Sequence, residues 1–303
     1  MIYLKILSSL LPSPTIMSDT KRPRGRPKSD GNKAQLVIRG PIGAPVIAGS
    51  LVEVLIQDPS TLKKMYKSFT SDKTGTKGII INFLKSDFEF ICENHDKSVK
   101  LMIRYKIQNL ASYYVGIELS PVVSAVNTLF LSKLDKNCGS IRMFVHESRP
   151  HILIIDQILL TGTSIRKEVP IIRNYDYSEQ EGEVEGDDHA MSIEMPLYVL
   201  KSSLTTINAD KNENGICQIQ GFPQGIKIID NNNTTSEIPA TAATIISKTG
   251  EFVGISILLK LMTLFTSVTP SNTMKLFIDE YQKTILSAED DNGICQFFIF
   301  IRP

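Results

Sequence analysis

The chain has 303 residues, 42% of them hydrophobic, which allows a packed core and favours two domains or one large one. It contains no apolar run of 18 residues, so we predict no membrane span. The four cysteines are scattered without a CxxC pair, which is typical of reduced thiols in an intracellular protein and excludes a disulfide framework. The formal net charge is only +1, but charge is distributed unevenly.

The first 45 residues are predicted to be a disordered tail with one basic motif. Residues 21–28, KRPRGRPK, hold five positive charges and no negative one. The central Arg-Gly-Arg-Pro resembles an AT hook, in which glycine lets the backbone enter a narrow minor groove and alternate arginines reach along it. We therefore predict DNA contacts from Arg22, Arg24, Arg26 and Lys28. The alternative interpretation is a generic basic tail or a nuclear-import signal.

The first half of the body, residues 50–174, alternates strands with two short helices. A helix is predicted to begin at Pro59, with Asp58 as its N-cap. Lys63, Lys64 and Lys67 lie on its polar face. A second helix is predicted over 120–130, with Ser120 as its cap and Pro121 directly after the cap. Period-two or β-branched patterns predict strands at 51–56, 78–83, 88–95, 99–107, 113–119, 140–147, 151–157 and 168–175.

Residues 175–190 are predicted to be an acidic connecting loop, because 176–188 hold seven acidic side chains and no basic one. The pattern then restarts over 191–303. Helices are predicted at 196–207 and 256–268, with Lys201 and Lys260 on their polar faces. The predicted strands are 191–195, 215–222, 225–232, 243–250, 251–255, 274–281, 283–289 and 293–301.

The recurrence of the helices indicates an internal duplication. Within each half the predicted helix starts lie about 60 residues apart, at Pro59, Pro121, Pro196 and Ser256. Four amphipathic helices among many antiparallel strands predict an α+β fold of two similar domains, each with two short helices on curved antiparallel sheets. Edge strands of such sheets can pair with another chain, and 151–157 and the strand near 241–248 are the candidates.

Signals for catalysis are weak. The chain has no phosphate-binding GxxxxGK[ST] motif, and the glycine-rich 40–49 lacks the spacing of a dinucleotide fingerprint. His146 and His151 flank a predicted hairpin without a third metal ligand at suitable spacing. We therefore expect no enzyme, no cofactor and no metal.

Several segments resemble the DNA sliding clamps of the proliferating cell nuclear antigen family. PSTLKKMYKSF (59–69) resembles the first helix of that family, and ILLKLMTLFTSVTP (257–270) resembles its last helix. MSIEMP (191–196) resembles the start of the second domain, and NGICQFFIFIRP (292–303) resembles the C-terminal strand. The resemblance covers roughly residues 50–303 and fits a divergent clamp of the kind found in large DNA viruses.

The resemblance implies a ring-forming, non-enzymatic processivity factor, usually a homotrimer, with helices lining a hole for double-stranded DNA. It implies DNA contacts from Lys63, Lys64, Lys67, Lys201 and Lys260. It also implies that DNA polymerase and other replication or repair proteins dock short motifs at Val99, Tyr175, Tyr177, Phe298 and Phe300. The expected location is the nucleus or an intracellular viral replication site.

Two departures and two alternatives accompany this interpretation. Ser124, Asn127 and Ser267 stand where the family usually has lysines, which predicts a less positive hole. The first alternative is an AT-hook DNA-binding regulator whose β-rich body binds proteins. The second is a clamp-like processivity factor that does not form a ring.

Overall fold

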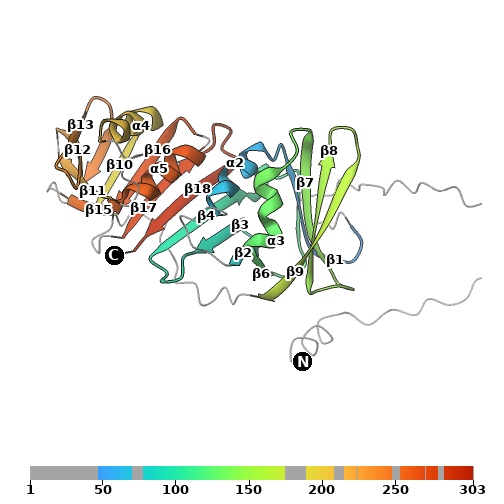
Figure 1. Ribbon diagram of the computed structural model, residues 1–303. Coiled ribbons are helices and arrows are strands. Elements are labelled where there is room, and N and C mark those ends of the chain that lie inside the picture. The colour runs from blue at the N-terminus through green and yellow to red at the C-terminus, as the bar shows by residue number, and fades with distance from the viewer. Residues whose placement is uncertain are drawn as a thin grey trace, which may run out of the picture. The chain divides into compact units, whose positions relative to one another are not determined.

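The computed structural model describes residues 47–69, 78–174, 189–207, 215–222, 224–247, 253–269, 271–278 and 283–302. Within them, antiparallel strands predominate and four short α-helices accompany the sheets (Figure 1). The predicted tail 1–45 and most of the predicted connecting loop lie outside the described residues, with Arg22, Arg24, Arg26, Lys28, Tyr175 and Tyr177 among them.

The elements of the first half follow the predicted order of strand, helix and several strands. They are β1 (Ser50–Gln57), α2 (Ser60–Phe69), β2 (Gly78–Phe83), β3 (Asp87–Glu93), β4 (Val99–Lys106), η1 (Ile107–Asn109), β5 (Ser112–Val115), β6 (Pro121–Ser124), α3 (Ala125–Thr128), η2 (Leu129–Lys133), β7 (Cys138–His146), β8 (Ile152–Leu159) and β9 (Ser164–Asn174).

The second half repeats that order. Its elements are β10 (Met191–Pro196), α4 (Leu197–Thr206), β11 (Ile216–Phe222), β12 (Gly225–Asp230), β13 (Thr235–Pro239), β14 (Thr244–Ser247), β15 (Val253–Leu258), α5 (Leu259–Val268), β16 (Thr273–Ile278), β17 (Thr284–Glu289) and β18 (Cys295–Ile301).

The two halves share one sheet. Its 14 strands run in the order β14-β10-β16-β17-β18-β4-β3-β2-β6-β9-β8-β7-β1-β5, and a second sheet runs β13-β12-β11-β15. The halves join where β18 pairs antiparallel with β4, from Cys295 opposite Tyr105 to Ile301 opposite Val99. This pairing makes the backbone continuous in hydrogen bonding from one half to the other.

The main core lies between the helices and one face of the sheets. Leu62, Met65 and Tyr66 of α2 pack there with Phe265 of α5 and Phe297 of β18, all of them buried. The opposite face of the shared sheet carries a smaller apolar cluster, formed by Ile80, Ile91, Met102, Val122, Phe298 and Phe300. Because side chains alternate along a strand, one face can hold the helices while the other carries this second cluster.

Two helices begin later than predicted. The expected helix at 120–130 is instead β6 followed by α3 and η2, because β-branched Val122 and Val123 pair with β2. The expected helix at 256–268 begins at Leu259, because Ser256 and its neighbours extend β15 along β11. In both places a strand runs directly into the helix, so the apolar residues before the helix belong to the sheet.

Of the two predicted edge strands, one lies inside a sheet and the other ends a sheet. The segment 151–157 forms most of β8, which pairs with β7 on one side and β9 on the other, so it offers no free edge. The segment near 241–248 contains β14, which does end the large sheet. Sequence reasoning missed β13, a five-residue strand that ends the smaller sheet.

Candidate nucleic-acid and partner interfaces

Three of the predicted DNA-contacting lysines lie close together. Lys64 and Lys67 are exposed on α2, and Lys201 is exposed on α4. The pKa of Lys64 is lowered, first by partial burial and then by the positive charges of Lys201 and Lys67. Mutual repulsion of this kind requires the ammonium groups to share one surface, and an anion placed there would relieve it. The structure therefore joins lysines from both halves in one basic cluster.

Two lysines also have a structural task. Lys63 Nζ donates a hydrogen bond of 2.5 Å to the carbonyl of Leu134, at the end of η2. Lys64 Nζ donates one of 2.8 Å to the carbonyl of Thr269, at the end of α5. Cations favour helix C-termini because the last carbonyls carry partial negative charge. Lys63 is half-buried in this arrangement, so Lys64, Lys67 and Lys201 are the better placed of the predicted contacts.

The rest of the helical surface is weakly charged. Lys260 is half-buried at the start of α5. On α3, Val126 is 79% exposed and Asn127 is exposed. They occupy the surface for which the family resemblance implied lysines. Hydroxyl groups on α4 and α5 bond back to their own helices: Thr205 to Lys201, Thr206 to Ser202 and Thr263 to Leu259. Besides the cluster on α2 and α4, the described helices carry one further exposed lysine, Lys133 at the end of η2.

The predicted partner residues do not all share one surface. Val99 packs in the main core, whereas Phe298 and Phe300 belong to the smaller cluster on the opposite face of the sheet. Phe298 and Phe300 stack with ring centroids 5.7 Å apart. Lys100 lies over the Phe300 ring and Arg104 over the Phe298 ring, at 5.2 and 5.5 Å from the centroids. Lys100, and not its neighbour Val99, therefore lies on the same face of the sheet as Phe298 and Phe300.

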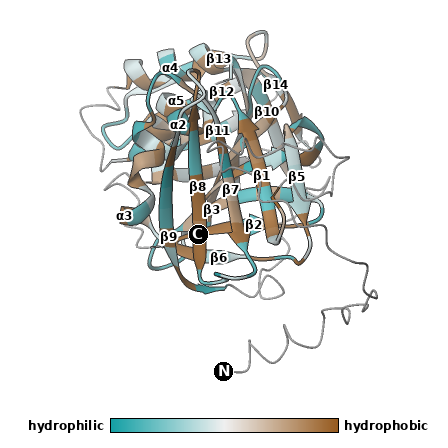
Figure 2. Cartoon of the chain, turned by 90° about the vertical axis from the view of Figure 1, so that its right-hand side faces the viewer, coloured by the Kyte–Doolittle hydropathy of each residue, from teal (hydrophilic) through white to brown (hydrophobic). Residues whose placement is uncertain are grey.

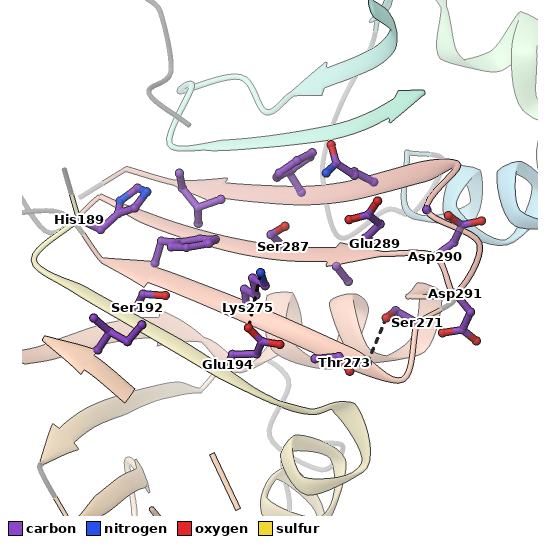
Figure 3. Close-up of a pocket in the computed structure, with 17 residues that line it drawn as sticks. His189, Ser192, Glu194, Ser271, Thr273, Lys275, Ser287, Glu289, Asp290 and Asp291 are labelled. Carbon is purple, nitrogen blue, oxygen red and sulfur yellow. Dashed lines mark hydrogen bonds and ion pairs between the residues drawn. The ribbon is translucent and has the colours of Figure 1, made fainter. Parts of the chain in front are cut away.

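A groove of about 980 Å³ lies on the face of the sheet opposite the helices, the outer face, over β18, β17, β16, β10 and β14 (Figure 3). It runs along these strands and includes Phe298 in its lining. His189 lies at one end of it and Asp290 and Asp291 at the other (Figure 3). The His189 ring packs on Phe277, with centroids 4.7 Å apart. Apart from Phe298, sequence reasoning did not single out any of its residues. Alternation along the C-terminal strands was the signal that could have found them, since it places 285, 287 and 289 on one face.

Among the strands with an open edge, β9 and β13 are the candidates for pairing with another chain. Within the described residues, β9 pairs with β6 only from Ile171 onward, so the edge of its first part is free on that side. Most of β9 is exposed, including Ile165 and Ile172 at 41% and 64%. Figure 2 shows β9 at the side of the sheet that contains β8, β7 and β1. In the smaller sheet β13 pairs only with β12 as far as the described chain shows.

Two of the thiols in the described part of the chain, those of Cys217 and Cys295, are deeply buried. Burial raises the pKa of the Cys217 thiol to about 12 and raises that of Cys295 well above its usual range. Such thiols stay protonated and are poor nucleophiles or ligands at neutral pH. The described part of the chain holds no cluster of three metal-ligating side chains. It also holds no helix long and apolar enough to cross a bilayer.

The architecture is an α+β fold of two similar halves, with helices on one face of antiparallel sheets. It is similar to the crystal structure of proliferating cellular nuclear antigen from Entamoeba histolytica, with a TM-score of 0.65 and 12% sequence identity. The match covers 84% of this chain and 99% of that one. No protein-family model and no curated protein matches the chain. The likeness confirms the predicted fold class.

Proposed function

We propose that this protein is a ring-forming DNA sliding clamp, a non-enzymatic processivity factor that tethers replication and repair proteins to double-stranded DNA. The observation that carries the proposal is the fold, which matches nearly the whole length of the Entamoeba histolytica chain. The basic cluster of Lys64, Lys67 and Lys201 supports it, because it lies on helices contributed by both halves.

Ring closure would use two of the open strand edges, those of β9 and β13. The free part of β9 in the first half would pair with β13 in the second half of the next subunit, which makes a head-to-tail contact. Ile165 offers apolar area beside the free edge of β9. Such a contact is heterologous and closes only at a fixed rotation, and we propose closure at three subunits. This pair of strands replaces the two predicted interface strands, namely 151–157, whose edges are both occupied, and the strand near 241–248.

A ring holds DNA by enclosing it, so weak and sequence-independent phosphate contacts suffice. The sparse cations of the helical face fit this requirement, and a net charge of +1 is no obstacle to it. The basic tail would add minor-groove contacts from Arg24 and Arg26 and so slow escape from DNA. Partner proteins would dock on the outer face near Phe298 and Phe300. The proposed location is the compartment in which DNA is replicated.

The proposal is tested by asking whether linear DNA with blocked ends retains the protein. The protein is incubated with linear duplex, both ends are then blocked with bound streptavidin, and the complex is washed at high salt. A ring is retained on blocked DNA and is lost from the same DNA with free ends, because only topology resists salt. Equal loss from both DNAs would contradict the ring and favour the AT-hook regulator.

A further inference from the structure

The side chains in the outer groove form three rows across five strands, β14, β10, β16, β17 and β18. Register places Ser192, Phe277 and Ile285 side by side in the first row, and Ile246 of β14 lies next to Ser192. The second row is Glu194, Lys275, Ser287 and Phe298. In the third row Glu289 lies opposite Gln296, next to the turn that holds Asp290 and Asp291.

The two outer rows differ in chemistry. The first row is mainly apolar and aromatic. The half-buried Phe277 packs against the His189 ring, and Ile246 is 63% exposed. The third row is acidic, since Glu289 and Asp291 lie together at that end of the groove (Figure 3). Asp290 beside them is buried and accepts hydrogen bonds from the amides of Ile294 and Cys295, so it is not counted among the charges that face a ligand. Lys106 binds Glu289 at 2.6 Å and offsets one of these charges. Lys275 of the middle row is paired with Glu194 at 3.5 Å.

The distance between the first and third rows sets the spacing between the apolar and the basic residues of a ligand. Ile285 and Glu289 are four residues apart on β17, which corresponds to about 13 Å along an extended strand. A segment that lies along the groove would therefore place an apolar side chain over the first row. Its Lys or Arg, about four residues away, would reach the acidic end.

We propose that the groove docks an extended segment of a partner protein that carries a large apolar residue and, about four residues away, a pair of basic residues. The proposal rests on the proposed function only for the kind of partner, since the groove belongs to the single chain. The chain's own KRPRGRPK matches the charge but has no aromatic or large aliphatic residue for the Phe277 end. A partner segment therefore suits the groove better.

The test uses a fluorescein-labelled peptide with the core Phe-Ser-Ser-Ser-Arg-Arg and the full-length protein, read by fluorescence anisotropy. We expect it to bind at least about fivefold more tightly than Phe-Ser-Ser-Ser-Glu-Glu, and more tightly than a peptide whose arginines directly follow the phenylalanine. Asp291→Lys should reverse the preference between the arginine and glutamate peptides. Ile246→Ser should weaken both peptides, because it removes apolar area at the other end.

Glu147→Lys is the matched control, because this exposed carboxylate lies in the turn between β7 and β8, in the other half. It should leave the preference unchanged. Equal binding of the two peptides, or a Glu147→Lys effect as large as that of Asp291→Lys, would overturn the proposal. Tighter peptide binding after Arg24→Ala with Arg26→Ala would also overturn it, because the chain's own tail would then be the occupant. Peptide binding by a monomer would support the groove while refuting the ring.

Discussion

The ammonium group of Lys64 on α2 donates a hydrogen bond of 2.8 Å to the carbonyl of Thr269, the residue that directly follows α5. These residues belong to different halves of the chain, so the bond joins the halves on the helical side of the sheet. On the strand side the halves are joined by the pairing of β4 with β18. Lys64 thus contributes both to the basic cluster and to the junction.

Loss of this bond should weaken the junction. We expect Lys64→Met, which keeps most of the side-chain volume, to lower the free energy of unfolding by about 1 kcal/mol. Equilibrium urea unfolding measures it, with Lys136→Met as the control, because Lys136 is exposed in the turn before β7. Equal stability of the two variants would show that the Lys64–Thr269 bond contributes nothing net.

The basic cluster should set the salt dependence of DNA binding. We expect Lys67→Ala together with Lys201→Ala to reduce the slope of log K against log salt by about 2, close to 0.9 for each phosphate that the protein no longer neutralises. Binding of a short duplex at several salt concentrations measures the slope. An unchanged slope would place the DNA contacts elsewhere on the protein.

The tail should act independently of the body. Arg24→Ala with Arg26→Ala should weaken binding to linear A·T-rich duplex at low salt, because neither position could then reach into the narrow minor groove. Assembly should be unaffected. Gel-shift titration against A·T-rich and G·C-rich duplexes separates this effect from a general reduction in positive charge. If affinity for both duplexes is retained, the motif is not a minor-groove hook.

The buried carboxylate of Glu53 should make stability depend on pH. Burial raises its pKa above 4.5, opposed chiefly by Arg142 at 3.4 Å. The folded state then holds the proton more tightly than the unfolded state, so the contribution of Glu53 to stability falls as pH rises through the window above 4.5.

Glu53→Gln keeps the side-chain shape and removes this titration. We expect the variant to gain stability relative to the native chain as pH rises from about 4.5 toward neutrality. Urea unfolding at several pH values gives the difference in free energy. A difference that is constant across the range, or that changes in the opposite direction, would contradict the account.

The sequence predicted much of the fold because its elements are strongly patterned. The pattern Leu62, Met65, Tyr66 and Phe69 indicated α2, and all four residues are buried. Period-two patterns likewise indicated β16 and β17. The errors occurred where local pattern and tertiary pairing disagree: Val122 and Val123 precede a helix but pair in a sheet. The short polar β13 has exposed Thr235 and Glu237, so little in its composition marks a strand.

The site was less predictable than the fold. The lysines on the polar helix faces could be identified, but the carbonyls that hold Lys63 and Lys64 lie 71 and 205 residues away in sequence. Val99 was expected beside Phe298, but strand alternation turns it into the main core. The groove joins residues from five strands, and their register is set by long-range pairing.

A closed ring of three subunits differs from a single chain in its mass in solution. Light scattering should give about three times the 33.7 kDa chain mass. Ile165→Glu should release monomers, because it would bury a charge at the proposed β9 contact at a cost of about 2 kcal/mol or more. Ile246→Glu, on β14, should keep the trimer. A native chain that stays monomeric at micromolar concentration would contradict the ring.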